Sequence, residues 1–92
     1  MKFKDAFDIM VRDGKEIKRK SWSGFWRWQN GTIWITTREG ETIDIRETTD
    51  VSYTIRNMLE DDWEICKYIK KFEVRENIHG TYLQEVYKMV EQ

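Results

Sequence analysis

The chain has 92 residues, and its 16 Lys and Arg residues nearly balance 17 Asp and Glu residues, for a net charge of −1. A chain this short builds one hydrophobic core, so we predict a single domain over residues 1–92. Five Trp, four Tyr and four Phe exclude an intrinsically disordered chain, and the apolar runs are too short for a membrane span or a signal peptide, which predicts a cytoplasmic protein without membrane contact.

Two scarce residue types restrict the chemistry further. Cys66 is the only cysteine and His79 the only histidine, which excludes an internal disulfide and a zinc site built from several Cys and His side chains. We expect Cys66 to be a small buried residue of a strand and His79 to be an ordinary loop residue. The prediction is a protein that is not an enzyme and that holds no metal and no cofactor.

The N-terminal segment predicts a helix over residues 3–13. Phe3, Ala6, Phe7 and Met10 recur at helical spacing, and Gly14 stands where a left-handed C-terminal cap belongs. Most other residues of this segment are charged, so the helix should pack a single apolar stripe against the rest of the protein.

Residues 16–20 alternate as a strand does. Ile17 and Arg19 then share one side, whereas Lys18 and Lys20 lie on the other side, at a solvated strand edge. An arginine that points inward needs an anion, which is either a carboxylate of the protein or a phosphate of a ligand. Arg19 is therefore a candidate site residue.

The strongest local signal is Asn30-Gly31 between two aromatic and β-branched runs, residues 25–29 and 32–36. Asn-Gly favours a two-residue turn in which both residues take positive φ, so we predict a β-hairpin. The turn also fixes the register of the two strands. The facing pairs are Gln29 with Thr32, Trp28 with Ile33, Arg27 with Trp34, and Trp26 with Ile35.

A third strand of this sheet, residues 42–46, follows a loop at residues 38–40 with Gly40 in the left-handed position. This loop length places Ile35 opposite Ile43 and Ile33 opposite Ile45. The predicted core side of the sheet holds Trp26, Trp28, Ile33, Ile35, Ile43 and Ile45. The second side holds Phe25, Arg27, Trp34, Asp44 and Arg46.

A second helix is predicted from about residue 51, with Thr49 or Asp50 as its N-cap. Its apolar residues recur at helical spacing; they are Val51, Ile55, Met58 and Leu59. After it, Trp63 and Ile65 alternate with acidic residues in a further strand.

The tail, residues 67–92, predicts a short charged strand around Phe72 and Val74. A C-terminal helix is predicted from the spacing of Leu83, Val86, Tyr87 and Val90. The predicted fold class is therefore α+β: an antiparallel sheet of about five strands with an N-terminal helix, a second helix before the last core strand, and a C-terminal helix.

The tryptophans divide into core and candidate site residues. Three are predicted to pack in the core: Trp26, Trp28 and Trp63. Trp22 differs because it lies in a Ser/Gly loop beside basic residues, where its ring can stack on a planar ligand. Trp34, opposite Arg27, forms either a cation–π pair on an exposed face or part of a subunit interface.

Several motifs together resemble a known family. They are Arg19-Lys20-Ser21-Trp22-Ser23-Gly24, Asp44-Ile45-Arg46-Glu47-Thr48, Tyr53-Thr54 and Leu59-Glu60-Asp61-Asp62-Trp63-Glu64-Ile65. Residues 1–66 resemble the second type of Thoeris anti-defence proteins of phages and prophages, formerly classed as a domain of unknown function. The most specific parts are Arg-x-x-Trp-x-Gly and the Asp-Trp near the end. Residues 67–92 lie outside the resemblance.

The resemblance implies a sponge, a protein that sequesters an immune signalling nucleotide of the cyclic ADP-ribose type without cleaving it and so blocks Thoeris anti-phage defence. It also implies a homo-oligomer, a dimer of dimers with pockets between protomers, in the bacterial host cytoplasm. The family motif positions fall on Arg19, Trp22 and Asp62 as ligand-binding residues, with Asp50 at the start of the second helix. Asn57, where the family often has Asp, completes the set.

The residue types agree with that implication. A ligand with adenine, two riboses and a diphosphate requires a stacking ring, a cation, and carboxylates that accept hydrogen bonds from hydroxyls. Trp22, Arg19 and Asp62 supply one of each.

Two alternatives from other functional classes remain open. The first is a module for single-stranded nucleic acid that uses Lys15, Lys18 and Lys20, although a net charge of −1 disfavours it. The second is a phage inhibitor that acts by protein contact through Trp34, Arg27 and the last helix.

Overall fold

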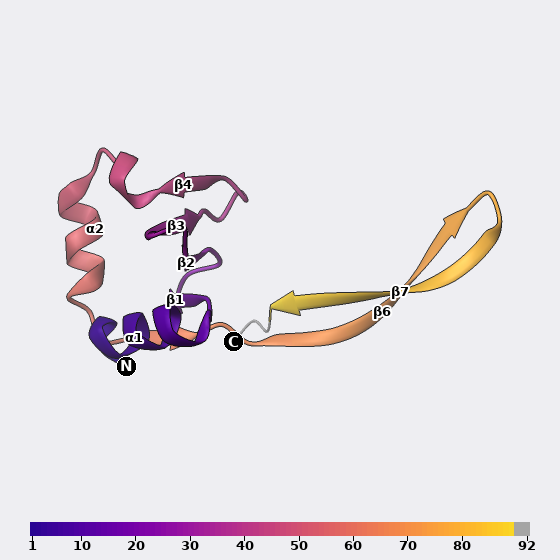
Figure 1. Ribbon diagram of the computed structural model, residues 1–92, viewed down its shortest axis with the longest axis horizontal. Helices are drawn as coiled ribbons and strands as arrows, with labels where there is room; N and C mark the ends of the chain where they lie inside the picture. Colours follow the sequence, from indigo (N-terminus) through magenta and orange to yellow (C-terminus); the bar gives the residue numbers. More distant parts are fainter. Residues whose placement is uncertain (90–92) are drawn as a thin grey trace.

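The computed structural model describes residues 1–89 and has an α+β fold (Figure 1). Its antiparallel five-stranded sheet has the order β4-β3-β2-β1-β5. These strands are β1 (Ile17–Arg19), β2 (Phe25–Gln29), β3 (Thr32–Thr36), β4 (Thr42–Asp44) and β5 (Trp63–Ile65). The helices are α1 (Phe3–Asp13) and α2 (Val51–Met58). The predicted α+β class and five-stranded antiparallel sheet are confirmed.

Helix α1 begins and ends where the sequence predicts. Gly14 takes the left-handed conformation, with φ of 66°, and its backbone N–H donates to the carbonyl oxygen of Met10. Ala6 and Met10 are fully buried. The alternation of apolar and charged residues therefore produces one packed stripe on this helix.

The β2–β3 hairpin confirms the Asn-Gly turn and its register. Asn30 has φ of 54° and Gly31 φ of 75°, the positive values that such a turn requires. All four predicted pairs are present, including Trp26 with Ile35 and Arg27 with Trp34.

Strand β4 is shorter than predicted. Ile35 does face Ile43 and Gly40 has φ of 87°, as expected. The strand ends at Asp44, however, and residues Ile45–Glu47 form a 3-10 helix, η1, so the predicted pairing of Ile33 with Ile45 is wrong. The cause is local: the carboxylate of Asp44 accepts the backbone N–H of Arg46 and turns the chain out of the sheet.

The hydrophobic core lies between the sheet and α1 and centres on Trp63, which is 1% exposed. The rings of Trp26 and Trp63 lie 5.0 Å apart, and both contact Phe3. Trp28, also predicted to be a core residue, is 36% exposed. It lies at the end of β2 and packs edge-on against Phe7 of α1, so its other side stays in solvent.

Helix α2 presents a face that the sequence pattern does not predict. Asn57 is buried and Met58 packs against the core. Val51, Ile55 and Leu59, predicted to be its apolar contact face, are exposed. The pattern fails because hydrogen bonds satisfy the Asn57 amide, so a polar residue takes an inner position.

The second side of the sheet carries charged residues beside aromatic ones. Asp44 is buried and accepts hydrogen bonds from Thr32 and Arg46, and these bonds hold its pKa far below the usual range. The Trp34 indole N–H donates to the carbonyl oxygen of Gln29. Whether the Trp34 face is a subunit interface stays a prediction.

The tail forms a β-hairpin in place of the predicted C-terminal helix. Strands β6 (Tyr68–Asn77) and β7 (Gly80–Met89) pair with each other in a separate two-stranded sheet. The hairpin projects from the body (Figure 1) and gives the molecule extents of 52 × 25 × 24 Å. Residues predicted to be helical, among them Leu83 and Val86, lie in β7, and Val90 lies outside the described residues.

Candidate functional site

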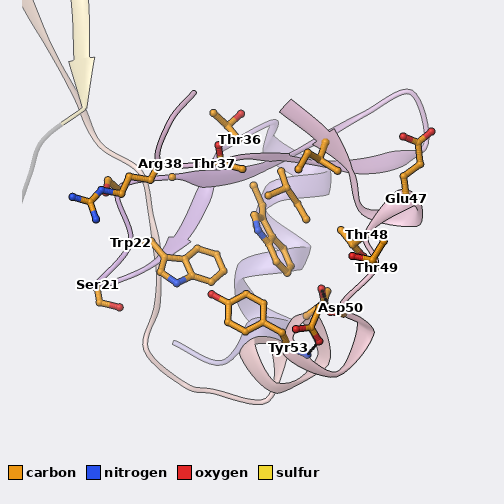
Figure 2. A pocket seen from close by; sticks show the side chains of 16 residues that line it. Ser21, Trp22, Thr36, Thr37, Arg38, Glu47, Thr48, Thr49, Asp50 and Tyr53 are labelled. Carbon is orange, nitrogen blue, oxygen red and sulfur yellow. Dashed lines mark hydrogen bonds between the residues drawn. The ribbon is translucent and has the colours of Figure 1, made fainter. Parts of the chain in front are cut away.

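A pocket of about 530 Å³ opens between the loop after β1, the β3–β4 hairpin and the start of α2 (Figure 2). This volume is in the range of small-molecule sites. Its aromatic and aliphatic lining consists of Trp22, Trp26, Ile35, Ile43 and Tyr53. Its polar lining includes seven hydroxyl side chains: Ser21, Ser23, Thr36, Thr37, Thr48, Thr49 and Thr54.

Two rings of different exposure form one wall of the pocket. Trp22 packs against Trp26 and Trp63, with ring centroids 5.6 and 5.2 Å away, so its position is fixed by the core. Tyr53 of α2 is 59% exposed, and Figure 2 shows its ring beside that of Trp22. The pair offers a flat ligand two aromatic surfaces, one packed on the core and one exposed.

Charged side chains stand around the pocket. The Asp50 carboxylate caps α2 by accepting the backbone N–H of Tyr53 at 3.0 Å, as the predicted N-cap should. Arg38 is the one basic side chain among the described residues that line the pocket. In Figure 2 the Arg38 and Glu47 side chains point away from the two rings.

The loop that presents Trp22 is held by a buried lysine. Lys18 Nζ donates to the Trp22 carbonyl oxygen at 2.8 Å and lies 3.4 Å from Glu64. Lys18 is 5% exposed, so its predicted place at a solvated edge is wrong. The reason is topological, because β1 is not an edge strand but pairs with β2 on one side and β5 on the other.

Arg19 forms an ion pair with a carboxylate of the protein, that of Asp62. Its Nε and Nη2 atoms donate to the two carboxylate oxygens of Asp62 at 2.8 and 3.1 Å, a bidentate pair. Its Nη1 donates to the Asn57 side-chain oxygen at 2.6 Å. The hydrogen bond from Arg19 lowers the pKa of Asp62. Of the two anions considered from the sequence, the structure contains the protein carboxylate.

Asn57 connects this network to both the core and the pocket. Its side-chain N–H donates to the Tyr53 carbonyl oxygen at 2.8 Å. Its backbone carbonyl accepts the Trp63 indole N–H at 2.9 Å. The network therefore fixes α2, and with it Tyr53, relative to β1 and β5.

The five residues expected at a ligand site thus fall into two groups. Trp22 and Asp50 line the pocket. Arg19, Asn57 and Asp62 contact one another beside it and are not among its lining residues.

Tyr53 and Arg38 are among the pocket residues that sequence reasoning missed. The position of Tyr53 three residues after the cap Asp50, away from the predicted apolar stripe, was the available signal. Nothing in the sequence pattern indicates Arg38, because the β3–β4 hairpin brings it to the pocket.

Gly24 lines the pocket where its backbone packs closely against that of Thr36 and Thr37. A methyl group at this position would collide with the Thr36 carbonyl oxygen and come within 3.1 Å of the Thr37 carbonyl carbon. Both are backbone atoms, so no side-chain rotation relieves the contact. We expect Gly24→Ala to destabilise the protein by about 1 to 3 kcal/mol, whereas Ser23→Ala, at an exposed position, leaves the melting temperature unchanged. Equal melting temperatures would contradict this close approach.

Reactive side chains are few near the site. Burial raises the pKa of the Cys66 thiol to about 12, which makes it a poor nucleophile. Among the side chains that the structure describes, no cluster of three or more His, Cys, Asp or Glu residues is placed to hold a metal ion. No described helix is long and apolar enough to cross a membrane.

The fold and pocket define a small α+β protein with an aromatic and hydroxyl-rich cavity. Comparison of the chain with family models, curated proteins and solved structures gives no match.

Proposed function

We propose that this protein binds and sequesters a nucleotide of the cyclic ADP-ribose type without cleaving it. The observation that carries the proposal is the pocket of about 530 Å³ in which the Trp22 and Tyr53 rings lie beside hydroxyl side chains. The Thoeris anti-defence role, cytoplasmic location and assembly as a dimer of dimers belong to the same proposal and rest on the sequence resemblance.

The lining supports a ligand with a base, riboses and phosphates. An adenine stacks on aromatic faces, and the serine and threonine hydroxyls donate to or accept from sugar hydroxyls and phosphate oxygens. Arg38 at the rim takes the role of the phosphate-binding cation, because Arg19 is occupied by Asp62. Asp50 accepts a ribose hydroxyl beside its capping bond.

Arg19, Asn57 and Asp62 then act as positioning residues. Their network holds the backbone of Tyr53 through Asn57, so they affect the ligand through the ring that they place. Binding without turnover is supported by the composition of the pocket, since neither His nor Cys occurs among its described lining residues.

The direct test is calorimetric titration with a cyclic ADP-ribose isomer, followed by mass spectrometry of the ligand released on denaturation. We expect saturable binding and recovery of the intact nucleotide. Recovery of a hydrolysed product would replace the proposal with an enzyme. Binding of single-stranded oligonucleotides that weakens steeply with salt would favour the nucleic-acid alternative, although Lys18 is already buried against Glu64.

Substitution of Tyr53 tests the aromatic contact with the ligand separately from protein stability. Tyr53→Ala removes an exposed ring while its backbone keeps both hydrogen bonds, so stability should change little. We expect affinity to fall about 5- to 150-fold, which corresponds to the roughly 1 to 3 kcal/mol of one base–aromatic contact.

The matched control is Tyr82→Ala, which removes a partly exposed ring from β7. The affinity of this variant for the cyclic ADP-ribose isomer should equal that of the unsubstituted protein. Trp22→Ala is less informative, because that ring also packs on Trp26 and Trp63. Unchanged affinity in Tyr53→Ala would remove this pocket from the proposal.

A further inference from the structure

The polar groups of the pocket differ from one side to the other. Thr37 and Arg38, from the loop between β3 and β4, lie on one side (Figure 2). Thr48 and Asp50, from the segment before α2, lie on the other. Hydrogen bonds within the protein already use some donors and acceptors on each side. The bonds that remain for a ligand therefore differ between the two sides.

The side next to α2, here called the acceptor side, consists of Glu47, Thr48, Asp50 and Thr54. Thr48 donates its hydroxyl proton to the carbonyl oxygen of Ile45 at 2.8 Å, and Thr54 donates its own to that of Asp50 at 3.1 Å. A hydroxyl has one proton and two lone pairs, so these two oxygens can only accept a further bond. The carboxylates of Glu47 and Asp50 are also acceptors only. This side therefore fits a ligand group that donates, such as a sugar hydroxyl.

Asp50 also occupies the place where a helix would hold a phosphate. The free N–H groups and the dipole at a helix N-terminus attract anions. At the start of α2 the Asp50 carboxylate accepts the Tyr53 N–H at 3.0 Å, and its own negative charge lies there. A phosphate that approached this terminus would meet a like charge and would find this donor already used.

The opposite side of the pocket offers donors. Thr37 Oγ1 accepts the backbone N–H of Glu41 at 3.1 Å, which leaves its hydroxyl proton for a ligand. The neighbouring Arg38 is exposed and carries donors only. Arg46, the cation nearest in sequence to the acceptor side, is bound to Asp44. Phosphate oxygens, which only accept, are therefore best satisfied beside Thr37 and Arg38.

We propose that the acceptor side makes the pocket selective for nucleotides whose ribose hydroxyls are free, and that it rejects nucleotides with a phosphate on one of those hydroxyls. This rule of specificity rests on the proposed function, which places a nucleotide in the pocket. The 5′-phosphate lies toward Arg38, and the ribose hydroxyls donate to Asp50 and its neighbours. A phosphate on a ribose hydroxyl replaces a donor with an acceptor and brings a negative charge toward two carboxylates.

Adenosine 5′-monophosphate and adenosine 3′,5′-bisphosphate differ by this one group, and NMR titration of the full chain compares them. We expect the bisphosphate to bind about 5- to 25-fold more weakly, because one contact between like charges near 4 Å in water costs about a factor of five. Asp50→Asn and Glu47→Gln remove the charges and keep the shapes, and Asn caps a helix as Asp does. In the double variant the difference should fall to within about twofold, with the melting temperature unchanged.

Two single variants are the controls. Arg38→Gln should weaken both nucleotides by a similar factor, since both carry the 5′-phosphate. Asp8→Asn removes a negative charge from an exposed position of α1 outside the pocket lining, so the ratio of the two affinities should not change.

Three results would overturn the proposal: equal affinities of the unsubstituted protein for the two nucleotides, an undiminished difference in the double variant, or no binding of adenosine 5′-monophosphate. A cyclic ADP-ribose isomer that fails to bind while the two nucleotides are still distinguished would reject the cyclic ligand of the proposed function. The same result would support the selectivity of the pocket.

Discussion

Trp63→Ala is expected to leave the protein largely unfolded at 37 °C. The ring is 1% exposed and lies 5.0 to 5.2 Å from the rings of Trp26, Phe3 and Trp22. Truncation of a buried Trp costs about 3 to 5 kcal/mol, and a domain of this size has a total stability at the low end of about 5 to 15 kcal/mol. The substitution also removes the indole N–H that donates to the Asn57 backbone carbonyl, which leaves that buried carbonyl without its hydrogen bond.

Trp28→Ala is the matched control, since it deletes the same side chain from the same core face. Trp28 is 36% exposed, and among the described side chains its ring contacts that of Phe7 alone. We expect a loss of about 1 kcal/mol, observed as a shift of roughly 4 to 8 °C in melting temperature by circular dichroism. Equal losses in the two variants would contradict the location of the core described above.

Short-range rules account for the part of this fold that could be predicted. The Asn30-Gly31 turn fixes the β2–β3 register, and Gly14 ends α1, because both depend on backbone preferences within a few residues. The side chain of Asp44 acts at equally short range. It was missed because an Asp in an alternating segment does not by itself indicate whether its carboxylate turns back on the chain.

The remaining failures involve partners distant in sequence. Nothing near Asn57 indicates that Arg19 will occupy its amide oxygen, so the inner face of α2 was assigned to Val51 and Ile55 instead. The spacing of Leu83 and Val86 fits a helix, but pairing with β6, which no local pattern reveals, places both residues in a strand.

In the candidate site, too, local sequence patterns predicted some residues, whereas others depend on partners distant in sequence. The loop Trp beside basic residues indicated Trp22, which does line the pocket. The capping rule identified Asp50 as the N-cap of α2, whereas only the family resemblance indicated it as a site residue. Arg19 was correctly placed on the inner side, yet residue type alone could not choose between Asp62 and a phosphate as its anion. Arg38 reaches the pocket only through the β3–β4 hairpin, which is information that no local pattern contains.

Lys18→Met is expected to destabilise the protein by about 3 to 5 kcal/mol, the cost of removing one partner from a buried ion pair. The substitution keeps most of the apolar stem but leaves Glu64, whose side chain is 15% exposed, without its cation. It also removes the donor to the Trp22 carbonyl. Lys20→Met, at an exposed position of the same segment, should change stability by less than about 0.5 kcal/mol.

The double variant Lys18→Met/Glu64→Leu separates the two contributions. Replacing both charges with apolar side chains removes the buried carboxylate, so most of the loss should be recovered. The Trp22 carbonyl still lacks its donor, which leaves a deficit of about 1 to 2 kcal/mol. Because that carbonyl belongs to the loop that presents the Trp22 ring, the double variant should be folded but bind the proposed nucleotide more weakly. Urea unfolding and calorimetry on the four proteins measure both effects, and equal stability of Lys18→Met and Lys20→Met would show that Lys18 is solvated after all.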